Sequence, residues 1–181
     1  MSGAAVWVVA MCVLAAHASA ADARIIPGFA IADVKIGMTL AQTKKILGKP
    51  QTLNARRQLA GHRRFIEYGW NFSSVWVGFV NTNGVLHSVL IGTSLAREKT
   101  KEGIGVGTPV KRLRGFPRMT CFTGTAWVGH PYFNPQQQQG PHCVLAGADR
   151  RRTIFVLKCI APQDFGCGTY VIERVIVRTS F

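Results

Sequence analysis

The side chains that could perform nucleophilic or acid–base chemistry are few and lie far apart along this chain. Four histidines follow residue 20, namely His62, His87, His130 and His142. Only eight residues are Asp or Glu, and the one close pair, Glu98 and Glu102, lies in a charged segment typical of solvated surface. Nucleophilic catalysis needs a nucleophile, a base and a group that orients the base. The sequence therefore predicts no catalytic residue, and a protein that is not an enzyme.

Two other patterns could bind a ligand, but each has a simpler interpretation. His130 and His142 flank one loop, yet no third metal ligand stands at a useful spacing. The glycine-rich run at 103–107 leads into an expected helix, whose N-terminal N–H groups could hold a phosphate. The run lacks the Gly-Lys-Ser/Thr ending of a nucleotide-binding loop, so a structural turn is favoured. The sequence predicts no metal and no cofactor.

The segment between Cys121 and Cys143 carries aromatic side chains in a stretch that has no counterpart earlier in the chain. These are Trp127, Tyr132 and Phe133. Aromatic side chains on a loop closed at its base lose little conformational entropy on binding, and such residues contribute strongly at protein interfaces. Two interpretations stay open: the rings form a recognition loop, or they pack back onto the protein.

The chain is strongly basic, with 22 Lys and Arg against 8 Asp and Glu and a formal net charge of +14. Arg150, Arg151 and Arg152 are expected at a hairpin turn and form a second candidate binding surface. A nucleic-acid site combines clustered basic residues with stacking aromatic rings. Here the basic residues are dispersed, so the charge favours attraction to an anionic envelope polymer or membrane surface over nucleic acid.

The cysteines indicate the compartment. Four of the five follow residue 20, namely Cys121, Cys143, Cys159 and Cys167. An even number in an exported chain implies disulfides, of which three connectivities are possible. Pairing Cys121 with Cys143 and Cys159 with Cys167 is favoured, because each bond then closes a local, irregular loop. A zinc site is the alternative, but zinc fingers favour close Cys-x-x-Cys pairs and none is present.

Residues 1–20 have the profile of a signal peptide. They contain no charged side chain, and the apolar stretch at 4–16 is too short to span a bilayer. Ala18 and Ala20 place small residues before a cleavage site ahead of Ala21. A retained N-terminal anchor helix is the alternative. The sequence thus predicts a secreted, periplasmic or cell-envelope protein with no transmembrane span in its mature chain.

An internal duplication is expected to organise the rest. Thr39 begins a short helix with a capping box to Gln42, and Gly48 with Pro50 ends it. A similar segment at 106–117 has Thr108 as its cap and Pro109 at the first helical position, and is three residues shorter. Strands should follow each helix, at 64–70, 75–80 and 85–91 in the first unit and at 143–147, 153–159 and 170–178 in the second.

These patterns predict an α+β fold. Each of two repeats would be a short helix packed on a three-stranded antiparallel sheet, and the two sheets would join into one curved sheet, since unpaired edges invite aggregation. The predicted organisation is a signal peptide at 1–20, a first repeat at 21–97, and a second repeat at 98–181 that carries the disulfide-closed loops. The charged segment 94–105 would connect the repeats at the surface.

The motif Ile36-Gly37-Met38-Thr39, its helix and the ending Leu47-Gly48-Lys49-Pro50 resemble the SmpA/OmlA, or BamE-like, envelope domains of bacteria. The tandem arrangement is similar to the secreted β-lactamase inhibitor protein family and to uncharacterised actinobacterial secreted proteins. That resemblance implies a saddle whose concave sheet and projecting loops bind another protein. This chain departs from the inhibitors, which carry one disulfide in each repeat, because all four cysteines lie in its second repeat.

Together these observations predict a secreted, non-catalytic binding module that engages an unidentified protein through its sheet face and aromatic loop. The alternative is a basic envelope-associated protein that binds anionic polymers or the membrane surface by charge. The candidate binding residues are Trp127, Tyr132, Phe133 and Arg150 to Arg152.

Overall fold

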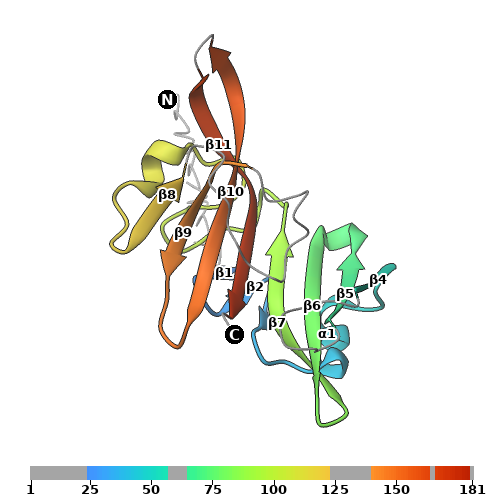
Figure 1. The fold of residues 1–181 in the computed structure, drawn as a ribbon. Helices are drawn as coiled ribbons and strands as arrows, with labels where there is room; N and C mark the ends of the chain where they lie inside the picture. Colours follow the sequence, from blue (N-terminus) through green and yellow to red (C-terminus); the bar gives the residue numbers. More distant parts are fainter. Residues whose placement is uncertain (1–23, 57–64, 123–139, 164–165, 180–181) are drawn as a thin grey trace, which may run out of the picture.

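The computed structural model describes residues 24–56, 65–122, 140–163 and 166–179, and this part of the chain is mainly β (Figure 1). A small antiparallel sheet contains β1 (Ile25–Ile26), β2 (Ala30–Ile31) and β3 (Val34–Lys35). The large antiparallel sheet has the strand order β4-β5-β6-β7-β11-β10-β9-β8. Its strands are β4 (Thr52–Arg56), β5 (Phe65–Trp70), β6 (Val75–Thr82), β7 (Val85–Thr93), β8 (Met119–Phe122), β9 (His142–Ala146), β10 (Arg151–Gln163) and β11 (Gly166–Thr179).

The first expected helix is confirmed as α1 (Leu40–Leu47). The Thr39 side chain accepts a hydrogen bond from the Gln42 N–H, and the Gln42 side chain accepts one from the Thr39 N–H. This reciprocal capping box satisfies two N–H groups that the first turn would otherwise leave without partners. Gly48 ends the helix at φ +80°, a backbone conformation that favours glycine.

The second expected helix is wrong. Residues Val110–Leu113 form only one 3₁₀ turn, η2, in which the Arg112 N–H donates to the Pro109 carbonyl. Pro109 is itself extended, and the Thr108 hydroxyl accepts from the Gly105 N–H instead of capping a helix. Few residues separate Pro109 from Gly115, and Lys111 lies one turn from Arg114, so an α-helix would be short and self-repelling.

The predicted α+β fold is therefore also wrong. One α-helix lies in the described part of the chain, beside an eight-stranded and a three-stranded antiparallel sheet, so no short helix recurs in each repeat. The two halves of the large sheet meet where β7 pairs with β11, with Ile91 opposite Val177 and Gly92 opposite Ile176. Pairing between these strands, rather than packing of helices, holds the two halves together.

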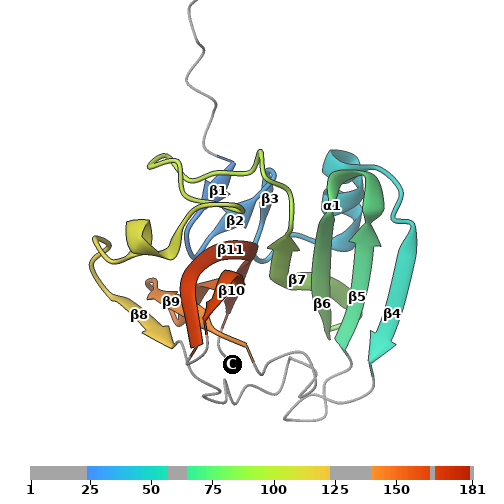
Figure 2. The same ribbon diagram turned by 90° about the horizontal axis from the view of Figure 1, so that it is seen from above.

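The large sheet has two faces of different character, which we call the first and second faces. Along β6, Val75, Val77 and Phe79 point to the first face and alternate with residues that point to the second. Figure 2 shows that α1 and the small sheet lie on one side of the large sheet. Buried side chains from the small sheet, including Ile31 and Val34, pack with the first face into the main core.

The charged connector at 94–105 is not solvated surface throughout, contrary to the sequence-based interpretation. Glu98 is 1% exposed, and its Oε1 lies 3.2 Å from a guanidinium nitrogen of Arg24 and 3.4 Å from Nε of Arg97. The Lys99 carbonyl accepts a hydrogen bond from the Ile25 N–H. The connector therefore binds the start of the small sheet through one buried carboxylate and one backbone hydrogen bond.

The second face has its own hydrophobic cluster, made of Phe65, Val80, Leu90, Ile154 and Ile176. Two glycines let aromatic rings lie flat on the sheet there. A Cβ on Gly78 would overlap the ring of Phe65, and a Cβ on Gly92 would overlap the indole of Trp76. Glycine is disfavoured inside strands unless another group approaches the backbone closely, as both rings do here.

Replacing Gly92 with alanine is expected to lower the free energy of unfolding by about 2 kcal/mol, because the added methyl group must displace the indole of Trp76. Gly115→Ala is the matched control, since nothing lies within 4 Å of a Cβ built there. Urea unfolding of both variants measures the difference. Equal midpoints for the two variants would show that the indole does not rest on Gly92.

Candidate functional site

The two ends of the aromatic segment meet at the edge of the large sheet. Cys121 on β8 and Cys143 on β9 are directly opposite and form the predicted disulfide, with their Cα atoms 3.9 Å apart. The next residues along, Phe122 and His142, are also opposite, and their rings stack with centroids 5.0 Å apart. Trp127, Tyr132 and Phe133 lie outside the described residues.

The second predicted disulfide, between Cys159 and Cys167, is also confirmed, and it lies in a projecting ribbon. β10 pairs with β9 only over residues 152–156, and β11 pairs with β7 only over residues 175–178. Beyond these ladders, β10 and β11 continue as a two-stranded ribbon that extends past the rest of the sheet (Figure 1). Ile160 on this ribbon is 56% exposed.

The three arginines at the β9–β10 turn do not form one surface. Arg150 is exposed and has φ +59°. Arg151 begins β10, and its guanidinium lies over the ring of Phe29, 5.3 Å from the centroid. Arg152 is exposed and lies opposite Arg178 in the β10–β11 ladder. Because successive side chains of a strand alternate between faces, Arg151 and Arg152 point to opposite sides of the sheet.

Lys35 also contributes to the basic group around Phe29. Its ammonium nitrogen lies 5.8 Å from the ring centroid, so one aromatic ring contacts two cations. The sequence reasoning missed Phe29 and Lys35, because they precede Arg151 by more than a hundred residues. It also missed the stack of Phe122 on His142, although each ring adjoins one cysteine of an expected pair and antiparallel pairing places them opposite.

The remaining sequence candidates have structural roles where they are described. The Gly107 N–H donates to the Ile172 carbonyl and the Gly105 N–H to the Thr108 hydroxyl, so these amides of the glycine-rich turn are already engaged. Nδ1 of His87 lies 3.0 Å from the Gly37 carbonyl, and Nδ1 of His142 lies 3.0 Å from the Gly140 carbonyl. No group of three metal-ligating side chains occurs among the residues that the structure describes.

Lys99 lies in the connector, in surroundings that lower its proton affinity. Burial lowers the pKa of the Lys99 ammonium from its ordinary value, and the neighbouring charge of Arg112 lowers it further. Nζ of Lys99 donates to the Val106 carbonyl 2.5 Å away. Lys99 thus fixes the loop before η2.

The two disulfides are typical of proteins that fold outside the reducing cytosol. Among the described residues, no helix is long and apolar enough to cross a membrane. The predicted signal peptide at 1–20 lies outside the described residues and stays a prediction. No family model, curated protein or solved structure matches this chain, so its function must be inferred from its own residues.

Proposed function

We propose that this protein is a secreted, non-catalytic binding module that engages a protein partner through the second face of its sheet and the aromatic loop between Cys121 and Cys143. The position of the loop ends carries the proposal. They leave neighbouring strands at the edge of the sheet and are joined by a disulfide. A loop constrained at its base loses less entropy on binding than a free one, which leaves more of the contact energy as affinity.

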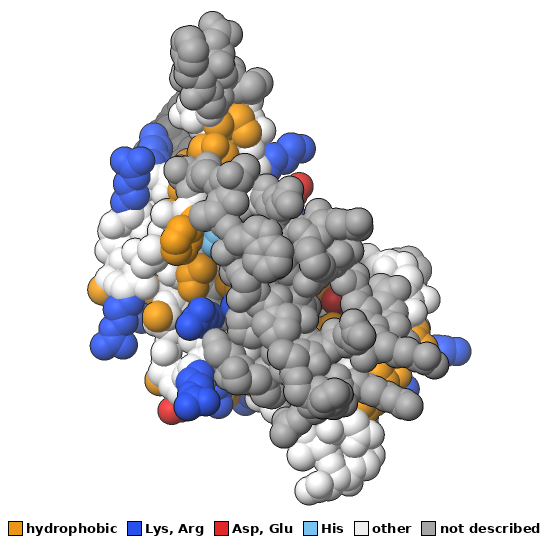
Figure 3. Space-filling view, viewed as in Figure 1, with side chains coloured by type: hydrophobic (Ala, Val, Ile, Leu, Met, Phe, Trp, Pro, Cys, Tyr) orange, Lys and Arg blue, Asp and Glu red, His pale blue; other side chains and the backbone are white. Residues whose placement is uncertain are grey.

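Apolar side chains near the ends of the loop favour a protein as the binding partner. Phe122 is 39% exposed, and Val144 and Val156 are only partly buried on the second face. Figure 3 looks at this face and shows hydrophobic side chains near the ribbon and down one side, next to described Lys and Arg side chains. Protein interfaces combine apolar contact area with polar and charged groups in this way.

A second candidate function is attachment to anionic envelope polymers or to a membrane surface by charge. The net charge of +14 favours it. The dispersed cations count against a specific site, since Arg151 and Arg152 point to opposite faces and α1 contributes Lys44 and Lys45 from elsewhere. Such binding would depend on the total charge rather than on any one loop.

Replacing Trp127, Tyr132 and Phe133 together with alanine is expected to reduce capture of the partner from envelope fractions at least tenfold, because aromatic anchors dominate binding energy at protein interfaces. Capture by the unaltered protein should persist in about 0.5 M salt, where interactions between exposed charges are largely screened. Quantitative mass spectrometry of the captured proteins measures both effects.

Replacing Gln136, Gln137 and Gln138 with alanine in the same loop is the matched control, and it should leave capture intact. If retention falls with rising salt in all three proteins alike, the charge-based alternative is correct. If capture survives high salt but ignores the aromatic triple substitution, the partner binds a different surface.

A further inference from the structure

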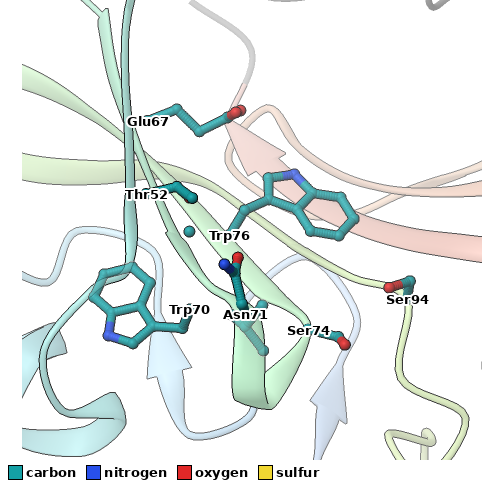
Figure 4. Close-up of a pocket in the computed structure, with 9 residues that line it drawn as sticks. Thr52, Glu67, Trp70, Asn71, Ser74, Trp76 and Ser94 are labelled. Carbon is teal, nitrogen blue, oxygen red and sulfur yellow. The ribbon is translucent and has the colours of Figure 1, made fainter.

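A polar hollow lies on the second face, where β5 turns through η1 (Asn71–Ser73) into β6. Its volume is about 340 Å³. The described polar groups around it are uncharged except for one carboxylate, and one indole ring forms its wall (Figure 4). The side chains concerned are Thr52, Glu67, Asn71, Ser74, Trp76 and Ser94. Trp70 also borders the hollow, but its indole points to the opposite side of the sheet and donates to the Gly48 carbonyl.

Trp76 is presented as a flat platform because both of its cross-strand neighbours are glycines. Gly69 on β5 and Gly92 on β7 lie directly opposite it in the two ladders. A Cβ on Gly92 would overlap the indole, so the ring rests on backbone. On Gly69, a Cβ would overlap the Thr52 hydroxyl. The indole therefore has one face on the sheet, and it is only partly buried where it packs against the second-face cluster.

Two side-chain groups at the hollow, the Glu67 carboxylate and the indole N–H of Trp76, make no hydrogen bond within the part of the chain that the structure describes. No ion pair there involves Glu67 either. Figure 4 shows Glu67 extending toward the nitrogen-bearing edge of the Trp76 indole. One strong acceptor and one donor thus border the same space, together with the Asn71 amide and three hydroxyl groups.

The Glu67 carboxylate and the net positive charge of the protein favour an uncharged ligand. Among the described residues that line the hollow, Glu67 is the one charged side chain, and it would repel an anion. A cation would approach a protein of net charge +14 against its overall field. An apolar ligand would remove the polar groups from water without replacing their hydrogen bonds. A neutral molecule with many hydroxyl groups and one flat C–H face satisfies the carboxylate, the amide, the hydroxyls and the ring together.

We propose that this hollow binds one pyranose ring of a neutral glycan. The C–H face of the sugar stacks on the Trp76 indole, while Glu67 accepts hydrogen bonds from its hydroxyl groups and Asn71 both donates and accepts. Hydrogen bonds to an ionised acceptor are stronger than those between neutral groups, so Glu67 supplies much of the orientation. This glycan site lies on the same second face as the proposed protein contact, but on β4 to β7 and not at the Cys121 to Cys143 loop, and it goes beyond the proposed protein binding.

The test is a titration of the full-length exported protein, labelled with ¹⁵N, with two neutral tetrasaccharides: a tetramer of N-acetylglucosamine and cellotetraose. At least one should shift the indole N–H signal of Trp76 and the amide of Gly92 saturably, at sugar concentrations up to about 10 mM. Glu67→Gln should weaken the binding about tenfold, since it replaces a charged acceptor with a neutral amide. Trp76→Ala should abolish the shift at Gly92.

Glu173→Gln is the matched control, because Glu173 is a half-exposed strand carboxylate on β11, outside the hollow. The Glu173→Gln protein should bind sugar as the unaltered protein does. Unchanged urea midpoints for all variants exclude unfolding as the cause of lost binding. The proposal is overturned if neither sugar gives a saturable shift, or if N-acetylarginine amide binds the same signals more tightly, which would mark a cation site. Failure here leaves capture of a protein partner by the aromatic loop unaffected, so the two ideas are separable.

Discussion

Removing the Cys121 to Cys143 disulfide is expected to lower the free energy of unfolding by about 3 kcal/mol. The bond joins residues 22 positions apart, and without it the unfolded chain gains the freedom to open that loop. Cys121→Ser with Cys143→Ala is the appropriate pair, because Cys121 is exposed while Cys143 is 0% exposed and packs in the main core. Urea unfolding of the oxidised proteins, followed by circular dichroism, gives the difference.

The same variant should also lose capture of a protein partner under conditions in which it remains folded, because the loop ends are no longer held together. The second disulfide provides the control. It closes a loop of only 8 residues, and Cys159→Ser with Cys167→Ser should cost roughly 2 kcal/mol. It should not affect contacts made by the aromatic loop. Full capture by the Cys121 and Cys143 variant would remove the main support for the proposed function.

Replacing Arg24 with methionine is expected to cost about 3 kcal/mol, because it leaves the buried Glu98 carboxylate with one contact, to the mostly exposed Arg97. Oε2 of Glu98 already has no hydrogen-bond partner among the described residues. The carboxylate therefore depends on the guanidinium groups of Arg24 and Arg97, which contact Oε1. Removing the partly exposed partner, Arg24, leaves the negative charge of the buried partner, Glu98, without compensation in the protein interior.

A double-mutant cycle separates this effect from lost packing of the arginine stem. Glu98→Gln removes the charge, so Arg24→Met should cost much less in that background than in the unaltered protein. Thermal unfolding at neutral pH of all four proteins gives the coupling energy. Equal costs in both backgrounds would mean that the ion pair does not hold the connector against the small sheet.

Several local features could be read correctly from the sequence. The capping box of Thr39 and Gln42, the turn at 81–84 and both disulfide pairings depend on residues close together in the chain. The expected strands likewise correspond to β5, β6, β7, β9, β10 and β11. Each involves a short-range pattern whose physical cause, a cap, a turn type or a covalent loop, is contained in the pattern itself.

The second helix shows where such reading failed. The segment after Thr108 has a helix-like start and end, but its first helical position is extended and its interior carries neighbouring cations. The segment resembles the one after Thr39 but is three residues shorter. Three residues are nearly one turn of an α-helix, so the shorter segment has less room for a helix. The prediction of a second helix rested on the similarity between the two segments and not on the helix propensity of residues 109–115. The α+β fold class predicted from it was therefore wrong.

The candidate sites depended more heavily on tertiary structure. The contact of Arg151 with Phe29 joins residues more than a hundred positions apart, and the triplet at 150–152 was divided between faces by its entry into β10. The environment of Trp76 depends on glycines in two other strands, and no pattern within β6 indicates them. The burial of Glu98 likewise required the connector to lie against the start of β1.

The sequence by itself determined α1, most strands and the excess of positive charge, and it favoured the disulfide pairing that the structure confirms, because these follow from composition and from interactions within short stretches of chain. The tertiary structure alone decided that β7 pairs with β11, that β8 forms an edge and that Trp76 lies between Gly69 and Gly92. The physical reason is register. A shift of one residue between paired strands exchanges the two faces of each, and the packing of both faces fixes that register only in the folded protein.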